Sequence, residues 1–578
     1  MTEENKPVAP VQQIENISLE SFEKAVYSRS YDRAGVLMLE ALRKLKMGAE
    51  FIGYVPEPRM KGILYTRFCS AIVALISDPG IKLSGPGFDC LAAEHAITDQ
   101  AFRASVYSSS DHILPQMAAN PSEADRTKLK LEDGGALLKF LLTYSLRSAF
   151  GLNFEETFKR SPQITLSLWA GMNSALLTTA TQAFERREQL LGMHDIFKDA
   201  KLQDAAMPTL SDAYMYCSYG VRSDKHDMKA TVHRLFYRRL REFAPSKDRL
   251  GARRANALAN FGQRKPRLLV ACEWWASLHA MFRCYAPIIR QLRANYYVIG
   301  MSRARDTDDL AKLEFDERHE VPTSDVDLGK LAKAIDALEP DVIYYPSLGM
   351  ALWWVAMASL RLASVQVMTL GHPASSRSPA MDYVIAEPEC IGDPSLFTEE
   401  IIPIPFGSAR FLMRADAVFP ESAWDPSPDV VEVAVPAMLC KLNAPFMATL
   451  RKIQETSTQK LRFHLFINMT GLNLFQAARE IREWLPDSQV YERTAYNDYL
   501  GHLRKCHLHL CTFPFGGTNS NIDSMLLGIP IVTKEGLEPH ERFDAMMIRR
   551  AGLPEYLITH SVDDYVATAV QLVEEHGV

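Results

Sequence analysis

The sequence predicts an N-terminal all-α domain followed by two α/β units, each built on a parallel sheet. Three observations support this fold class. Apolar residues recur at helical spacing through roughly the first 250 residues, where strand-like runs are few. From Lys265 onward, short β-branched runs alternate with helix-like segments, which is typical of parallel sheets with crossover helices. The chain has 578 residues, which is too many for one hydrophobic core and indicates about two to four domains.

The predicted all-α domain covers residues 1–255. Its clearest helical pattern lies between Ser18 and Lys46, where apolar side chains recur so that they share one helix face. These side chains belong to Phe22, Val26, Ala34, Met38 and Leu42. Similar amphipathic patterns occupy residues 136–150 and 166–191. No sequence repeat is found, so an array of helical repeats is not supported.

The first α/β unit is predicted over residues 256–425 and begins after a basic linker at Lys265. Its predicted strands are short apolar runs, the first of them rich in valine and leucine. They are the runs RLLVAC, NYYVIGMS, DVIYYPSLGM and VQVMTL. Helix-like segments lie between them, and Pro340 ends one of these. The alternation predicts one Rossmann-like unit.

A second such unit is predicted over residues 426–578, after an irregular proline-rich stretch from Ile402 to Pro428. Its predicted strands are VVEVAV, RFHLFINMT, LHLCTFPF and IPIVT. Two Rossmann-like units in tandem usually bind a ligand in the cleft between them, at the carboxyl ends of their strands. Candidate site residues are therefore those that directly follow predicted strands.

Composition and motifs exclude several function classes. The net charge of about −6 gives no indication of nucleic-acid binding. Basic residues concentrate between Arg222 and Arg267, which favours a solvated helix face and a linker, with a basic docking surface as the alternative. The nine cysteines form no CxxC motif, so neither a zinc site nor a disulfide framework is indicated. The absence of GxxxxGK[ST], HExxH and GxSxG removes support for P-loop, zinc-hydrolase and α/β-hydrolase chemistry.

The sequence predicts a cytoplasmic protein without membrane insertion. Residues 1–16 are polar and lack the apolar core of a secretory signal. The most apolar window starts at Met350, and Arg361 and Gln366 interrupt it. We therefore expect a buried helix followed by a strand there, and no membrane span.

The segment FPFGGTNSNIDSMLLGIP is the first candidate site. Gly516 and Gly517 follow a predicted strand, where glycines can adopt a positive φ and let backbone N–H groups approach a ligand. The next helix begins between Thr518 and Asn521, and its free N–H groups suit a phosphate. Asp523, one turn into that helix, could bind ribose hydroxyls. The structural alternative is a tight turn, with Asp523 only a favourable charge near the helix N-terminus.

Three further residues follow predicted strands. Lys441 could neutralise a diphosphate leaving group, or it could be a surface lysine. His372 and His279 could act as bases or as phosphate and sugar ligands, although a single histidine is more often structural.

The acidic triplets at Asp306–Asp308 and Asp325–Asp327 lie in charged, loop-like contexts, so we interpret them as solvated and not as metal ligands.

Four segments together carry a family resemblance: LGHPASS, CKLNAPF, PFGGTNSNIDSMLLGIP and HERFDAMMIRRAGLPEYL. They resemble the bacterial cytoplasmic N-glycosyltransferases that modify high-molecular-weight adhesins, which are relatives of the O-GlcNAc transferases. The segment YYPSLGMALWW also fits, and the resemblance is strongest from Leu268 to Tyr565. The N-terminal helical region is compatible with the all-α domain of that family.

The resemblance implies a GT-B fold, in which the nucleotide sugar lies between an acceptor-side domain and a nucleotide-binding domain. It implies inverting, metal-independent transfer of a hexose, usually glucose from UDP-glucose, to asparagine amides in Asn-X-Ser/Thr sequons. The expected partners are thus a UDP-sugar and an adhesin-like acceptor polypeptide, with no cofactor and no metal. Residues matched by motif would bind the nucleotide sugar: Gly371, His372, Lys441, Gly516, Gly517, Thr518, Asn519 and Asp523.

The same motif matches suggest catalytic roles for three residues. Lys441 would neutralise the diphosphate, and His372 would lie beside the diphosphate and sugar. His279, aligned through a shared Glu…Ser…His…Arg pattern, would face the acceptor or the sugar and is the candidate general base.

The sequence also departs from the family pattern. Met438 and Leu439 stand where relatives have a threonine-rich run, and Met469 stands where they have a glutamine. The segment EWWASLH keeps one histidine where relatives are histidine-rich. The alternatives are therefore an O-glycosyltransferase or glycan-extending transferase of the same fold, or a degenerate UDP-binding scaffold. The chain ends at Val578, short of the helix that often crosses back in GT-B folds, which leaves open whether the sequence is truncated there.

Overall fold

In the computed structural model, the described part of the chain divides into two compact units. One unit contains residues 1–150 and 470–476, and the other contains residues 151–469 and 477–578. The described residues are 17–49, 57–118, 120, 131, 134–176, 179–322, 327–408, 411–420 and 429–575. The polar N-terminal stretch at residues 1–16 lies outside them.

The first unit is helical, as predicted. Its helices are α1 (Leu19–Tyr27), α2 (Tyr31–Lys46), α3 (Pro58–Ser77), α4 (Gly85–Ala92), α5 (His95–Ala104) and α6 (Gly135–Thr143). The predicted apolar face between Ser18 and Lys46 is buried at all five positions. The five side chains lie on two helices, α1 and α2, and not on one continuous helix. The chain breaks between these helices because Arg29 adopts a φ of 57°.

Helix α3 is the one helix, among the described residues, whose length and composition would allow a membrane span. Its buried side chains include Phe68 and Ile72, and it packs against α1 and α5. The rings of Phe22 on α1 and Phe68 lie 5.5 Å apart. Core helices of water-soluble units have the same character, so this feature alone is weak support for a membrane location.

The second unit begins with further helices before its first strand. They are α7 (Phe154–Arg160), α8 (Pro162–Asn173), α9 (Thr181–Gly192), α10 (Met207–Tyr216), α11 (Asp227–Leu240) and α12 (Lys247–Ala259). Both α10 and α11 pack against α16 (Leu352–Met357), which lies within the first α/β part. The predicted domain boundary between residues 255 and 256 falls inside α12, and that between 425 and 426 lies outside the described residues. Both boundaries stay predictions.

The first sheet is parallel and has seven strands in the order β3-β2-β1-β4-β5-β6-β7. The strands are β1 (Arg267–Ala271), β2 (Tyr297–Ser302), β3 (Glu317–Glu320), β4 (Val342–Tyr345), β5 (Val365–Met368), β6 (Tyr383–Ala386) and β7 (Glu400–Pro403). The intervening helices include α13 (Ala280–Leu292), α14 (Asp309–Lys312), α15 (Leu328–Ala337) and α17 (Pro388–Ile391). The apolar window from Met350 forms α16 and then β5, as predicted.

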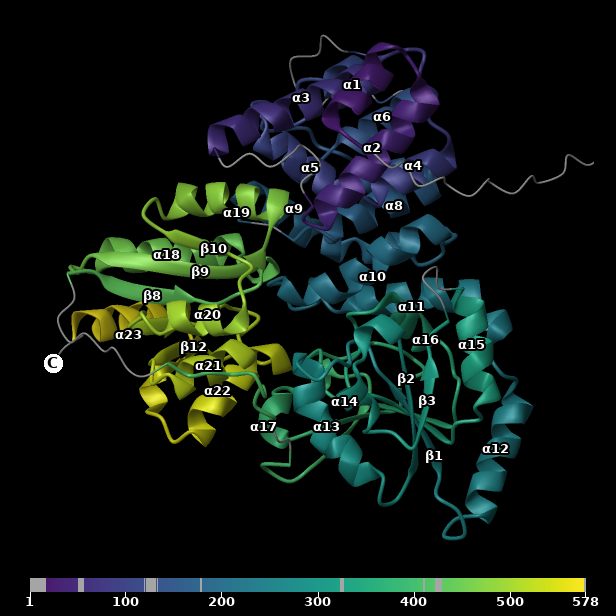
Figure 1. Cartoon of the computed structure of the whole chain (residues 1–578). Coiled ribbons are helices and arrows are strands. Elements are labelled where there is room, and N and C mark those ends of the chain that lie inside the picture. Colours follow the sequence, from purple (N-terminus) through teal and green to yellow (C-terminus); the bar gives the residue numbers. More distant parts are fainter. Residues whose placement is uncertain are drawn as a thin grey trace, which may run out of the picture. The chain divides into compact units, whose positions relative to one another are not determined.

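The second sheet is also parallel, with six strands in the order β10-β9-β8-β11-β12-β13. Figure 1 labels β8, β9, β10 and β12 of this sheet. The strands are β8 (Val431–Val435), β9 (Leu461–Met469), β10 (Gln489–Glu492), β11 (Leu508–Leu510), β12 (Ile531–Lys534) and β13 (Ile558–Thr559). The helices are α18 (Ala444–Thr456), α19 (Gly471–Trp484), α20 (Tyr496–Leu503), α21 (Asn519–Leu526), α22 (Pro539–Arg550) and α23 (Val562–Glu574). The predicted fold class, helices followed by two Rossmann-like sheets, is confirmed.

Both sheets reverse their strand order at one point. In the first sheet the reversal lies between β1 and β4, and in the second between β8 and β11. Connections leave in opposite directions there, so a crevice opens at the carboxyl ends of these strands. The edge strand β3, with the sequence ERHE, escaped the sequence analysis because it carries no apolar run.

A buried carboxylate joins the two loops at the reversal point of the first sheet. Glu273, which follows β1, is 1% exposed. Its Oε1 accepts hydrogen bonds from the backbone N–H groups of Gly349, Met350 and Ala351 at 3.0, 2.8 and 2.9 Å. Its Oε2 accepts one from the Ser347 hydroxyl at 2.8 Å. The Glu273 carboxylate therefore serves as the shared acceptor that holds the loop after β4.

Replacing Glu273 by alanine is expected to lower the free energy of unfolding of this domain by about 3 kcal/mol or more, because each buried donor left without a partner costs about 1–3 kcal/mol. Thermal unfolding followed by circular dichroism measures the effect. Glu400→Ala, at an exposed position of β7, is the matched control and should change stability by less than about 0.5 kcal/mol. Equal midpoints for the two variants would contradict the structural role of Glu273.

Candidate functional site

Two loops meet at the reversal point of the second sheet. One follows β8 and contains Lys441, and the other, Phe513–Thr518, follows β11. Strands β8 and β11 are hydrogen-bonded neighbours, so both loops open at the same place on the sheet edge. This is where the general rule for open α/β sheets places a ligand.

The ammonium group of Lys441 lies against the glycine loop. It donates a hydrogen bond to the carbonyl oxygen of Gly516 and lies 4.9 Å from the centre of the Phe515 ring. Burial lowers the pKa of Lys441, and the nearby carboxylate of Asp544 opposes that shift. The lysine is thus anchored in the loop and still offers donor capacity, since an ammonium group has three N–H bonds.

The glycine loop is held by Asp544, a residue of α22 to which the sequence analysis assigned no role. Its carboxylate oxygens accept hydrogen bonds from the backbone N–H groups of Gly517 and Thr518, at 2.8 and 3.0 Å. A Cβ atom on Gly516 would lie 2.0 Å from Oδ2 of Asp544, so only glycine fits there. Neither Gly516 nor Gly517 uses the positive φ that glycine permits: within this loop the positive φ, 45°, belongs to Thr518.

The first turn of α21 contains side-chain polar atoms that form no hydrogen bond within the described part of the chain. The Asn519 Oδ1 and Asn521 Nδ2 atoms are buried and have no hydrogen-bond partner among the described residues. The Ser520 hydroxyl is 3.3 Å from the carbonyl oxygen of Pro436. Because Asp544 occupies the two preceding N–H groups, any anion at this helix start would bind at Asn519 and beyond, and not on the glycines.

The carboxylate of Asp523 faces the same place from the second turn of α21. It is 7% exposed, and its Oδ1 accepts a hydrogen bond of 2.5 Å from the Tyr496 hydroxyl. Burial raises the pKa of Asp523, while the Tyr496 hydroxyl and the charges of Arg283 and Arg414 act in the opposite direction. The residue is therefore a polar group of the site and not only a charge near a helix end.

These loops border a cleft of about 440 Å³. Residues from both α/β parts line it: Ala280, Arg283, Arg414, Pro436, Ala437, Met438, Lys441, Phe466, Asn468, Glu492, Arg493, Thr494, Tyr496, Tyr499, Gly517, Asn519, Ser520 and Asp523. The cleft thus brings together Lys441, Gly517, Asn519 and Asp523 from the predicted set, with Gly516 and Thr518 next to them in the loop. The predicted residues His279, Gly371 and His372 do not line it.

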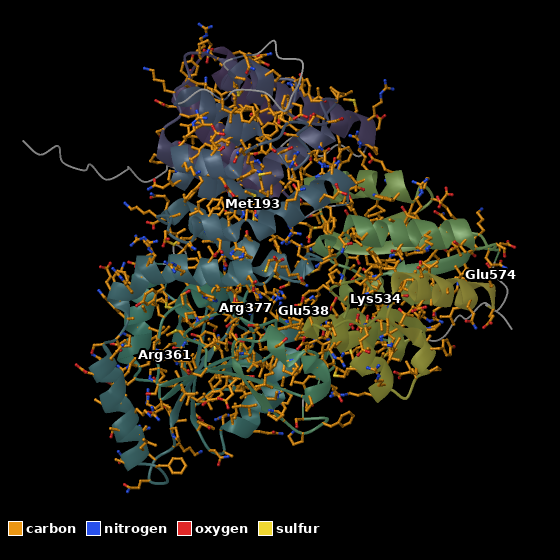
Figure 2. All side chains as sticks on the ribbon, turned by 180° about the vertical axis from the view of Figure 1, so that it is seen from behind. Met193, Arg361, Arg377, Lys534, Glu538 and Glu574 are labelled. Atoms are coloured by element: carbon orange, nitrogen blue, oxygen red, sulfur yellow. The ribbon has the colours of Figure 1, made fainter. Side chains whose placement is uncertain are left out.

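His372 is buried in a polar cluster behind the loop. Its Nε2 lies 2.9 Å from the Ser218 hydroxyl, which also lies 3.0 Å from Nε2 of His226. Nδ1 of His226 is 2.8 Å from Glu538, a residue that Figure 2 labels where the teal and yellow-green ribbons meet. Burial, with the charge of the nearby Lys229, lowers the pKa of His372 well below its usual value. A neutral imidazole therefore stands here.

Gly371 precedes His372 at a point of close backbone approach. A Cβ atom there would lie 2.5 Å from the carbonyl oxygen of Pro346 and 2.6 Å from the Cβ atom of Ser347. The glycine is therefore needed so that the loops after β4 and β5 can touch, and no ligand contact is required to explain it.

His226, Glu538 and His540 offer one ligand atom each within 4.8 Å of one another. Among the described residues, this is the group that could hold a metal ion. However, Lys225 forms a buried ion pair with the Glu538 carboxylate. A cation would have to displace that ammonium group, so the cluster fits an ion pair surrounded by neutral imidazoles better than a metal site. The expectation that no metal is needed stays a prediction.

His279 is the N-cap of α13. Its Nδ1 accepts a hydrogen bond of 3.2 Å from the backbone N–H of Met281. Burial and then the charge of Arg283 lower the pKa of His279, so the ring is neutral near pH 7 and carries its proton on Nε2. In this arrangement His279 is a hydrogen-bond donor, which does not fit a general base. The next residue, Ala280, lines the cleft.

Arg283, which was not among the residues predicted from the sequence, is 6% exposed and lines the cleft. Its Nε and Nη1 atoms are buried with no partner among the described residues, and its guanidinium lies 4.5 Å above the Phe411 ring. Arg283 lies one helical turn after His279, and its place in the Glu…Ser…His…Arg pattern was the signal that could have identified it.

Of the residues that replace the family pattern, some line the cleft and others do not. Met438 is 41% exposed and lines the cleft, whereas Leu439 is fully buried. Met469 ends β9 and does not line the cleft, but its neighbour Asn468, with a φ of 53°, does. Of these three replaced positions, only Met438 therefore alters the cleft surface directly.

The basic region and the described residues of the acidic triplets have structural partners. Most basic side chains between Arg222 and Arg267 form ion pairs, such as Arg249 with Asp336 at 3.2 Å. Exposed side chains such as Arg234, Arg238 and Arg249 support the interpretation as a solvated helix face, whereas Lys225 and Lys229 are buried. Asp308 caps α14 and accepts hydrogen bonds from Ser277. Residues 325 and 326 lie outside the described residues, and Asp327 caps α15.

Comparison with protein-family models gives two matches in the helical part. The model described as HMW1C N-terminal matches residues 16–150, and the model described as HMW1 domain 2 matches residues 155–240. The second range contains Ser218 and His226, the residues that contact His372 and Glu538.

Two curated relatives match along the whole chain. The UDP-glucose:protein N-beta-glucosyltransferase of Actinobacillus pleuropneumoniae serotype 5b (strain L20) is 29% identical, with 100% of this chain and 93% of the relative covered. Its counterpart from serotype 7 (strain AP76) is 28% identical over the same shares. Among solved structures, a mutant O-GlcNAc transferase of Thermobaculum terrenum aligns with a TM-score of 0.55 and 14% identity, covering 97% of this chain and 91% of that chain. The structural match supports the GT-B fold alone.

Replacing Gly516 by alanine is expected to weaken the binding of uridine diphosphate at least ten-fold. The added Cβ atom would displace the Asp544 carboxylate and, with it, the loop that carries the Lys441 contact. Isothermal titration calorimetry measures the affinity. Gly501→Ala is the matched control, because a Cβ atom there meets nothing within 4 Å. An unchanged affinity in Gly516→Ala would show that the loop geometry does not matter for the nucleotide.

Proposed function

Because this chain belongs to the family of UDP-sugar-dependent protein N-glycosyltransferases that carry HMW1 domains, we propose that it transfers glucose from UDP-glucose to asparagine amides in Asn-X-Ser/Thr sequons. We further propose that the reaction inverts the anomeric centre and needs no metal. The observation that carries the proposal is the cleft in which Lys441, Asn519 and Asp523 meet at the reversal point of the second sheet.

The leaving group determines what the site must supply. Departure of the nucleoside diphosphate develops negative charge, and a pre-placed cation or helix N-terminus stabilises that charge without reorganisation. Lys441 supplies the ammonium group, and the first turn of α21 supplies N–H groups and the Asn519 side chain. Asp523 can accept hydrogen bonds from ribose hydroxyls. The Lys441 ammonium group and the N–H groups of α21 can perform the role that a divalent cation has in other transferases.

The acceptor amide is a weak nucleophile, so its position near the anomeric carbon matters more than its activation. In a single displacement, the amide must approach from the face opposite the diphosphate. Arg283 reaches the cleft from the first α/β part, and His279 caps the same helix. We propose that this helix end belongs to the acceptor side and that His279 donates a hydrogen bond there.

One observation favours a second candidate function, a UDP-binding scaffold without transferase activity. Met438 places an apolar side chain in the cleft where the resemblance leads one to expect a polar run. Such a protein would bind UDP through Lys441 and Asp523 but would transfer no sugar.

The test is incubation of the full chain with UDP-glucose and an Asn-X-Thr peptide in buffer containing EDTA, read by mass spectrometry. We expect the mass of one hexose to be added, and no addition to a Gln-X-Thr peptide. Lys441→Ala should lower the rate at least about 100-fold, as removal of one charge-stabilising donor does in other enzymes. Lys452→Ala, at an exposed position of α18, is the matched control.

The outcomes of that assay are distinct. Hexose added to Ser-X-Thr peptides in place of asparagine peptides would indicate an O-glycosyltransferase. UDP binding without transfer from UDP-glucose, UDP-galactose or UDP-GlcNAc would indicate the scaffold. Activity that EDTA abolishes and added Mg²⁺ restores would refute metal independence.

The affinity for UDP should fall as pH rises above 7, and the fall should begin below the usual lysine pKa of about 10.4. Burial lowers the pKa of Lys441, so the free protein loses this charge at a lower pH than an exposed lysine would. The bound diphosphate requires the protonated form, so affinity decreases as pH rises through that pKa. Calorimetry across this range measures the trend. Lys441→Arg, which stays charged, should bind with a flatter profile, and parallel profiles for the two proteins would contradict the assignment.

A further inference from the structure

The carboxylate of Asp523 is oriented by a second side chain. The Tyr496 hydroxyl donates to Oδ1 at 2.5 Å, and both residues line the cleft. A carboxylate has capacity for about four hydrogen bonds, so this contact uses one and leaves the others. It also restricts rotation of the carboxyl group. Tyr496 thus acts on Asp523 without consuming its ability to accept hydrogen bonds from a ligand.

Tyr496 is in turn held from behind. The Arg414 guanidinium lies 4.2 Å from the centre of the Tyr496 ring, a cation–π geometry. Asp416 holds that guanidinium in a two-pronged ion pair, with distances of 2.9 and 2.6 Å. The guanidinium that packs against the Tyr496 ring is therefore itself oriented by two hydrogen bonds to Asp416.

Arg414 and Asp416 belong to residues 411–418, here called the strap, which connect the two α/β parts. At one end, Asn497 donates to the carbonyl oxygen of Asp416 and accepts from the N–H of Val418, both at 3.0 Å. At the other end, the N–H of Leu412 donates to the carbonyl oxygen of Arg283 at 2.9 Å. The strap is thus fastened to α20 on one side and to α13 on the other.

We propose that Tyr496, backed by the strap, is a positioning residue that orients Asp523 toward the ribose diol and so determines the preference for ribonucleotides over deoxyribonucleotides. This inference rests on the proposed function, in which the cleft binds a UDP-sugar. A ribose presents two adjacent hydroxyl donors, and a carboxylate can accept from both when its oxygens face them. Loss of one hydroxyl leaves a buried carboxylate oxygen without its partner, which is the kind of difference that separates close analogues strongly.

The alternative is that the hydrogen bond between Tyr496 and Asp523 only stabilises the domain. The two roles differ in what they change. A structural defect weakens the binding of every nucleotide by the same factor. A defect in the orientation of Asp523 weakens UDP more than 2′-deoxy-UDP or 3′-deoxy-UDP, because only UDP presents the complete diol.

The experiment measures dissociation constants for UDP, 2′-deoxy-UDP and 3′-deoxy-UDP by calorimetry on the full chain. The wild-type protein should bind UDP roughly ten- to hundred-fold more tightly than the weaker deoxy analogue, the range expected for one hydrogen bond to a charged group. Tyr496→Phe should reduce that ratio at least three-fold. Arg414→Met keeps much of the side-chain length but removes the charge. This variant should also reduce the ratio of the two affinities.

The matched control is Tyr491→Phe. Tyr491 also donates or accepts one hydrogen bond through its hydroxyl, to His464 at 2.8 Å, but it does not line the cleft. Its ratio should equal that of the wild-type protein. A wild-type ratio in Tyr496→Phe or, where that variant does not fold, in Arg414→Met would overturn the inference and leave the proposed function intact. Absence of UDP binding in the wild-type protein would overturn both.

Discussion

The hydrogen bonds from Gly517 and Thr518 to the Asp544 carboxylate are the interaction on which the cleft depends. They engage the two backbone N–H groups that precede the first turn of α21. They also explain Gly516, since the carboxylate occupies the space of a side chain there. The loop held in this way presents the carbonyl oxygen that receives the Lys441 ammonium group. One buried carboxylate thus determines the loop shape, the identity of a glycine and the position of the main cation.

The helical segment around Ser218 is part of this architecture and not a separate attachment. The Ser218 hydroxyl lies between the rings of His226 and His372, and Lys225 pairs with Glu538 on the second α/β part. Buried ion pairs of this kind contribute little net stability, but removal of one partner is costly. The helices that match HMW1 domain 2 therefore hold the loops after the strands of both sheets, which gives a physical reason for their presence in a transferase.

Much of the fold could be predicted because it depends on local patterns. Apolar periodicity identified the helices near Phe22 and Met38, and β-branched runs identified the central strands of both sheets. Lys441, Asn519 and Asp523 were found because each follows a predicted strand, and parallel sheets collect such positions at one edge. Prediction failed where this signal is absent, as at β3, whose side chains are charged. Arg283 and Tyr496 were missed because they lie on helices that reach the cleft only through packing.

The sequence by itself determined the order of helices and strands, the two parallel sheets and the strand ends that supply polar groups, because these follow from spacing along the chain. Only the tertiary structure decided which of those groups are free to bind. Asp544 occupies the N–H groups of Gly517 and Thr518, His372 is buried against Ser218, and His279 caps a helix. Each of these outcomes depends on a hydrogen-bond partner or on a backbone geometry that residue type alone does not specify. The choice of partner is set by distances in the folded protein, and no local pattern records them.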